Sequence, residues 1–103
     1  MKILAIEREA APEHEQAPSP LLTEEARRVW ELQTSGVIRE IYFRRDRPVA
    51  VLMLECASVD EATTILATLP LVRAGLIQFE IIPLSAYTGF SRLFAGERYP
   101  SDD

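Results

Sequence analysis

The sequence has only one cysteine and one histidine among its 103 residues, and this scarcity excludes several kinds of site. Cys56 has no second cysteine with which to form an intrachain disulfide, a pattern that is typical of a reducing compartment. His14 stands among scattered carboxylates without the spacing of metal ligands, so we predict no metal site. The four glycines do not form a phosphate-binding loop, and we predict no cofactor.

Basic residues are also scarce. The chain has 11 Lys and Arg residues against 16 Asp and Glu residues, which gives a formal net charge of −5. The average field of such a chain repels the phosphate backbone of a nucleic acid. Arg44, Arg45 and Arg47 form a local basic group, but Asp46 lies inside it and no aromatic ladder accompanies it. We interpret this group as a solvated turn and predict no nucleic-acid partner.

Long apolar runs are missing as well. No segment approaches the ~18 apolar residues that a transmembrane helix needs, so we predict no membrane partner. The first residues, MKILAIEREA, are interrupted by charge too soon to resemble a signal peptide. Together with the single cysteine, these observations lead us to expect a cytoplasmic protein.

The rest of the sequence alternates between strand-like and helix-like segments. Runs rich in β-branched and aromatic residues predict strands, and apolar stripes at helical spacing predict helices. Thr23 is the expected cap of the first helix, and the Ser58/Glu61 pair is typical of a capping box at the second. We expect Pro70 to end that second helix. The predicted strands are 2–7, 37–44, 49–56 and 77–83, the predicted helices are 23–35 and 58–69, and a long loop spans 8–20.

This β-α-β-β-α-β order predicts an α+β fold, the ferredoxin-like sandwich, in which both helices cover one face of an antiparallel sheet. The other face would carry apolar residues from all four strands, and a second copy packed sheet to sheet would cover it as a dimeric α+β barrel. We expect one domain over residues 1–95 and a frayed tail over 96–103. The C-terminal segment around Tyr87, Phe90 and Phe94 is expected to cross to the partner.

The segment between the second helix and the last strand carries a family pattern. It reads Leu69-Pro70-Leu71, then a turn at Gly75, then the strand IQFEII. Together with the chain length and element order, this pattern resembles the muconolactone isomerase-like family of dimeric α+β barrels. The resemblance implies a small-molecule pocket and chemistry without a cofactor. The cysteine and histidines that this family carries after its last strand and near its hairpin are missing here, so the resemblance transfers the fold and the pocket rather than lactone isomerisation itself.

Four residues are the predicted acid–base candidates: Glu7, His14, Tyr42 and Glu80. His14 lies in the long loop, where it is either a general acid or base over a pocket or a solvated histidine. Glu7 and Glu80 lie on the first and last strands, which are neighbours in this fold, so their carboxylates are expected to approach one another. Alternation places Tyr42 on the same sheet face as Ile38, either orienting a substrate oxygen or packing with a solvated hydroxyl.

Three further residues are predicted to bind the substrate: Trp30, Arg39 and Phe79. Trp30 lies on the apolar stripe of the first helix, where it is either core or pocket wall. Phe79 would form another part of the wall from the last strand. Arg39 lies in the hairpin, and Arg39 or Arg44 is the alternative partner that would turn Glu80 into a structural ion pair.

Two functions are consistent with these features. The first is a cofactor-independent enzyme that transfers a proton next to a carbonyl or lactone group of a small molecule, by resemblance to muconolactone isomerase. The second is a non-catalytic small-molecule-binding or assembly protein on the same dimeric barrel, which the missing family histidines favour. The two hypotheses differ in whether polar side chains converge on a shared cavity.

Overall fold

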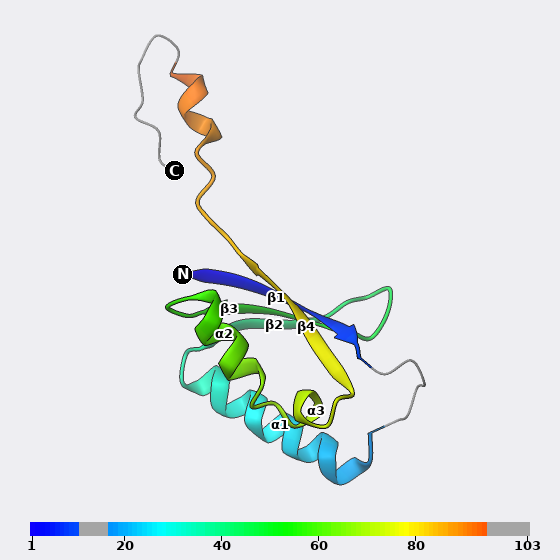
Figure 1. The fold of residues 1–103 in the computed structure, drawn as a ribbon. Helices are drawn as coiled ribbons and strands as arrows, with labels where there is room; N and C mark the ends of the chain where they lie inside the picture. The colour runs from blue at the N-terminus through cyan, green and yellow to red at the C-terminus, as the bar shows by residue number, and fades with distance from the viewer. Residues whose placement is uncertain (11–16, 95–103) are drawn as a thin grey trace.

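The computed structural model describes residues 1–10 and 17–94 of the chain. Within them, the four strands and two main helices follow the predicted order, and two short helices are added (Figure 1). The elements are β1 (Lys2–Glu9), α1 (Ser19–Thr34), β2 (Ile38–Phe43), β3 (Ala50–Glu55), α2 (Val59–Leu66), α3 (Pro70–Arg73), β4 (Ile77–Pro83) and the 3₁₀ helix η1 (Gly89–Leu93).

The strands form one antiparallel sheet in the order β2-β3-β1-β4, and α1, α2 and α3 all lie on one side of it (Figure 1). The central pair β1–β3 places Ile3 opposite Leu54 and Ala5 opposite Leu52. These four side chains face the helices and are almost fully buried. The predicted ferredoxin-like α+β sandwich is therefore confirmed.

The helices bury their apolar sides on this inner face of the sheet. The remaining core residues are Leu32 of α1, Ile38 of β2, and Cys56, Ala62, Leu66 and Leu69 in and around α2. Cys56 is a free thiol, and its burial raises its pKa above the ordinary value. Cys56 therefore packs in the core as a small apolar residue.

The first helix begins earlier than predicted. It starts at Ser19, and Pro20 lies in its first turn, where a missing backbone N–H costs no hydrogen bond. The Thr23 hydroxyl donates to the carbonyl of Ser19 (3.2 Å), which places Thr23 inside the helix rather than at its cap. β1 also runs on to Glu9, so the predicted loop 8–20 is shorter at both ends.

The predicted Ser58 cap of α2 is confirmed, but Glu61 reaches back to Ala57 rather than to the cap residue itself. The Ser58 hydroxyl accepts the backbone N–H of Glu61 (3.0 Å), and the Glu61 carboxylate accepts the N–H of Ala57 (2.8 Å). The end of this helix was predicted wrongly, because α2 stops at Leu66 and Pro70 begins α3 instead of ending α2. After α3, Gly75 adopts a φ of +77°, which few other residues tolerate, and the chain turns there into β4.

A β-bulge in β2 changes which residues share a face. Ile38 pairs with Leu54, but Glu40 pairs with the next residue, Met53, so one extra residue is inserted at Arg39. Ile38 is consequently buried under the helices, while Glu40 and Tyr42 lie on the other side of the sheet. The prediction that Tyr42 shares a face with Ile38 was wrong because simple alternation does not allow for a bulge.

The sheet surface away from the helices, which we call the open face, is apolar at its centre. Cross-strand partners lie on the same face, so the pairs Leu4–Met53, Leu4–Ile82 and Ile6–Val51 place these side chains together. All five are only partly buried. β2 adds the exposed ring of Tyr42, so every strand contributes to this surface, as predicted.

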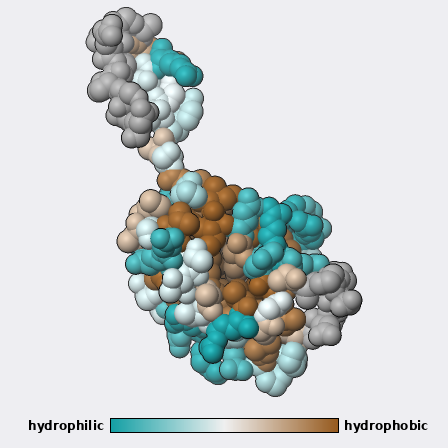
Figure 2. Space-filling model, in the orientation of Figure 1, coloured by the Kyte–Doolittle hydropathy of each residue, from teal (hydrophilic) through white to brown (hydrophobic). Residues whose placement is uncertain are grey.

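After β4 the chain leaves the body of the protein as a C-terminal arm, residues 84–94 (Figures 1 and 2). Within the arm, the rings of Tyr87 and Phe90 contact edge to face with their centres 4.8 Å apart. Tyr87, Phe90, Leu93 and Phe94 remain 60 to 75% exposed, because the body does not cover them. The predicted tail 96–103 lies outside the described residues.

Candidate functional site

A cavity of about 320 Å³ lies between α1 and the inner face of the sheet. We call it the helix–sheet cavity. Its volume is at the lower end of the range of ~300–1,000 Å³ that is common for small-ligand sites. Two carboxylates, Glu7 and Glu25, border it. The rest of its wall is apolar and consists of Leu22, Ala26, Val29, Ile41, Phe43, Ala50, Leu52, Leu69, Leu71, Ile77 and Phe79.

Glu7 reaches the cavity from β1. It follows Ile3 and Ala5 on the inner face of that strand, where the period of two directs alternate side chains toward the helices. Its Oε1 atom accepts the backbone N–H of Ala50, at the start of β3, over 2.9 Å. This hydrogen bond holds the carboxylate in place while leaving it at the border of the cavity.

Glu25 reaches the same cavity from α1. It is half-buried, and its Oε1 atom accepts the backbone N–H of Leu71 in α3 (2.9 Å). Burial raises the pKa of Glu25, and the nearby charge of Glu7 raises it further, while the Leu71 hydrogen bond works in the opposite direction. The net effect shifts Glu25 toward carrying a proton.

Sequence reasoning missed Glu25 because it assigned this residue to the acidic first turn of a helix that begins at Thr23. With the helix beginning at Ser19, Glu25 lies in its second turn. A signal for it was nevertheless present. Glu25 stands three residues after Leu22 and four before Val29, which is the spacing of residues on one face of a helix.

Of the seven predicted site residues, Glu7 and Phe79 border the helix–sheet cavity. They are direct cross-strand partners between β1 and β4, so their side chains point to the same face. The structure therefore brings together one predicted acid–base residue and one predicted wall residue, and it adds Glu25 to them. His14 lies outside the described residues.

Glu80 and Tyr42 lie on the open face instead. Glu80 is the cross-strand partner of Ile6, one register position away from Glu7, so the predicted approach of Glu7 and Glu80 was wrong. The carboxylate of Glu80 forms an exposed ion pair with Arg8, rather than with Arg39 or Arg44. The Tyr42 hydroxyl donates to Glu40 (2.9 Å), and this bond raises the pKa of Tyr42.

Trp30 and Arg39 also lie away from the cavity. Trp30 is 66% exposed, because the inner face of α1 runs through Glu25, Val29 and Leu32 and turns Trp30 outward. Within this chain, Trp30 is therefore neither a core residue nor part of the cavity wall, contrary to the prediction. Arg39 is exposed at the bulge, and its Nε donates to the carbonyl of Gly36 (2.6 Å).

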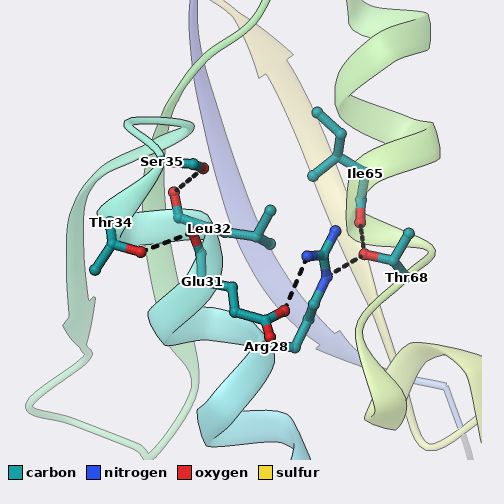
Figure 3. A network of polar contacts seen from close by, with 7 residues as sticks. All are labelled: Arg28, Glu31, Leu32, Thr34, Ser35, Ile65 and Thr68. Atoms are coloured by element: carbon teal, nitrogen blue, oxygen red, sulfur yellow. Dashed lines mark hydrogen bonds and ion pairs between the residues drawn. The ribbon is translucent and has the colours of Figure 1, made fainter.

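A polar network ties α1 to the segment after α2 and so holds one wall of the cavity (Figure 3). The guanidinium of Arg28 donates to the Thr68 hydroxyl (2.9 Å) and to the Glu31 carboxylate (3.1 Å). Thr68 in turn donates to the carbonyl of Ile65 (2.6 Å). The next residue, Leu69, is a buried part of the cavity wall, so the network fixes the distance between α1 and that wall.

The described residues form neither a metal site nor a membrane-spanning helix. Among residues 1–10 and 17–94, no group of three or more Asp, Glu, Cys or His side chains is arranged to hold a metal ion. In the same described ranges, no helix has the length and hydrophobicity needed to cross a membrane. The basic group of the β2–β3 turn is exposed, and Arg44 forms an ion pair with Asp46, as expected for a solvated turn.

Comparison with known proteins addresses the fold. The sequence matches no protein-family model and no curated protein. The structure is similar to the crystal structure of muconolactone isomerase, with a TM-score of 0.70 over 100% of both chains and 16% sequence identity. At that identity the likeness concerns the fold, and at that level it confirms the resemblance predicted from the sequence. The chain has the fold of muconolactone isomerase.

Proposed function

We propose that this chain is a cofactor-independent enzyme of isomerase type, which binds a small molecule in the helix–sheet cavity and moves a proton next to a carbonyl or lactone group. The observation that carries the proposal is the pair of carboxylates, Glu7 and Glu25, at the border of an otherwise apolar cavity. The likeness of the fold to muconolactone isomerase supports it.

The two carboxylates have different surroundings, which suits a division of roles. A carboxylate removes a proton from the carbon next to the carbonyl, and the electron pair of the broken C–H bond moves into the conjugated system. The same carboxyl group, or its neighbour, then returns a proton to another carbon, so that no net proton is consumed. We assign the proton transfer to Glu25, because burial raises its pKa. Glu7 and the Phe79 ring orient the substrate.

The other predicted residues enter this proposal differently. His14 stays a predicted acid–base residue. Tyr42 and Glu80 lie on the open face and do not reach the cavity of their own chain. Trp30 and Arg39 are exposed outside it. The proposed reaction therefore uses Glu7, Glu25 and Phe79. It does not need the four residues outside the cavity: Tyr42, Glu80, Trp30 and Arg39.

Hydrogen–deuterium exchange tests the proton transfer directly. A panel of unsaturated lactones and cyclic enones is incubated with the protein in D₂O, and loss of the proton signal next to the carbonyl is followed by NMR. We expect Glu25→Gln to slow any catalysed exchange by about 10²–10⁴-fold. Glu24→Gln is the matched control, because Glu24 is the neighbouring carboxylate on α1 and is exposed outside the cavity. Equal exchange in both variants would contradict the assigned role.

A second candidate function is non-catalytic binding of a small molecule on the same fold. It is favoured by the placement of Tyr42 and Glu80, which do not converge on the cavity with Glu7. Ligand binding that raises the melting temperature without any exchange above the buffer rate would support this alternative.

We also propose a homodimer formed through the open faces and the C-terminal arms. The partly buried apolar residues of the open face and the exposed rings of the arm are two apolar surfaces that this chain does not cover itself. Sedimentation at micromolar concentration should give about twice 11.6 kDa. The double variant Tyr87→Ser/Phe90→Ser should weaken the dimer at least about tenfold, whereas Ser85→Ala in the same arm should not. A monomeric wild-type chain would exclude the dimer.

The proposal places the protein in the cytoplasm. The support is that Cys56, the single cysteine, is a buried free thiol, which fits a reducing compartment.

A further inference from the structure

The charges around the helix–sheet cavity are all of one sign. Glu7 and Glu25 border it, and every other lining side chain in the described part of the chain is uncharged. Within residues 1–10 and 17–94, neither carboxylate forms an ion pair. Each accepts a backbone N–H group. An anionic ligand in this cavity would therefore meet negative charge in a partly buried space, where repulsion is stronger than in bulk water.

The two carboxylates also have unused hydrogen-bonding capacity. In each, Oε1 accepts one backbone N–H, from Ala50 in the case of Glu7 and from Leu71 in the case of Glu25. A carboxylate can accept about four hydrogen bonds through its two oxygens. A ligand that donates an O–H group therefore finds acceptors here, whereas a ligand that only accepts finds no partner.

The size and polarity of the wall limit the rest of the ligand. An apolar cavity of ~150 Å³ can hold one benzene ring, and this cavity measures about 320 Å³. The aromatic rings of Phe43 and Phe79 and aliphatic side chains form most of its lining. These features suit a flat molecule of two rings.

We propose that the helix–sheet cavity selects an uncharged two-ring molecule whose hydroxyl group donates a hydrogen bond to Glu7 or Glu25. The same ring skeleton carrying a carboxylate in place of the hydroxyl group is rejected. This inference rests on the proposed use of the cavity as the ligand site, but it does not depend on proton transfer.

Two arginines border a neighbouring hollow but not the helix–sheet cavity, so they do not line a site for an anionic ligand there. Arg8 and Arg47 border a separate hollow of about 290 Å³, which also contains Glu7. Arg8 is already paired with Glu80 on the open face. Arg47, the other described cation of that hollow, does not line the helix–sheet cavity.

Three probes with the same ring skeleton test this selectivity: 2-naphthol, naphthalene and 2-naphthoate, each titrated by NMR at pH 7 against the full chain. We expect 2-naphthol to bind most tightly and 2-naphthoate at least about tenfold more weakly than 2-naphthol. In the double variant Glu7→Gln/Glu25→Gln, the Kd of 2-naphthoate should lie within about threefold of the Kd of 2-naphthol. Glu24→Gln, the exposed neighbour, should keep the wild-type ratio.

Several results would overturn the proposal. These are equal or tighter binding of 2-naphthoate to the wild-type chain, binding of 2-naphthoate that is lost in Arg47→Gln, or no binding of any probe. If the double variant does not fold, the single variant Glu25→Gln, in which glutamine keeps an oxygen that accepts the Leu71 N–H, should reduce the penalty for 2-naphthoate in part, because Glu7 remains, and an unchanged penalty would overturn the proposal. Selective binding of 2-naphthol without deuterium exchange would confirm this inference while excluding the proposed proton transfer.

Discussion

Replacing Ala50 by leucine is the sharpest test of whether the helix–sheet cavity is open. Ala50 begins β3, its side chain borders the cavity, and its backbone N–H binds Glu7, a bond that does not depend on the side chain. Ala50→Leu adds three carbon atoms that point into existing space. We therefore expect the variant to be more stable than the wild type and to bind ligands less well.

The structure sets an upper bound on how much Ala50→Leu raises the free energy of unfolding. Burying one methylene group is worth about 0.8 kcal/mol, so three carbon atoms set an upper bound of ~2.4 kcal/mol, and lost side-chain entropy brings the expected gain to ~1.5 kcal/mol. The matched control is Ala5→Leu. Ala5 lies on the same inner face, opposite Leu52, but it is fully buried and does not border the cavity. Overpacking there should cost ~1–3 kcal/mol.

Urea denaturation followed by circular dichroism measures both changes at one fixed protein concentration. The two variants should shift the midpoint in opposite directions with an unchanged slope. In the same samples, Ala50→Leu should weaken binding of 2-naphthol. If Ala50→Leu is destabilised as much as Ala5→Leu, the space beside Ala50 is already filled, and both the cavity and the ligand site proposed for it are refuted.

Three further predictions concern the fold and the pair of carboxylates. Ser58→Ala should lose ~1 kcal/mol in urea denaturation because Ser58 caps α2, and unchanged stability would contradict that role. Leu54→Ala should lose ~2–5 kcal/mol, because Leu54 is fully buried, and a smaller loss would mean that the sheet core is looser than described. The pKa of Glu25 is raised above 4.5, so its contribution to stability is present below about pH 4.5 and lost as pH rises through the folded pKa. Glu25→Gln should therefore gain in melting temperature relative to wild type between pH 4 and pH 7, and a constant difference would exclude the raised pKa.

Local patterns in the sequence predicted most of the fold. The Ser58/Glu61 spacing and the turn at Gly75 depend on residues close in sequence, and the order of strands and helices predicted the sheet; each is present in the structure. The first helix began too late in the prediction because Pro18 and Pro20 indicated a loop. Proline is also compatible with the first turn of a helix, and that is the role of Pro20 here.

The site was only partly predictable, for two physical reasons. The first is register: Glu80 follows Phe79 directly and so faces away from Glu7, and the bulge at Arg39 moved Tyr42 to the open face. The second reason is that hydrophobicity alone predicts that a tryptophan is buried and that a glutamate is exposed. It placed Trp30 inside and overlooked Glu25, although the structure buries Glu25 further because the Leu71 N–H satisfies its carboxylate.

The projecting arm gives the chain an unusual shape, and that shape is measurable by X-ray scattering. The Cα radius of gyration is 17.3 Å, whereas a compact chain of about this length has a value near ~13 Å. The scattering curve of dilute protein, at concentrations where chains separate, should therefore show an elongated particle. Arms that pack against partner chains would change the maximum dimension per chain as the concentration rises. The engagement of Tyr87 and Phe90 can thus be followed as a change of shape, without a ligand, a label or an activity assay.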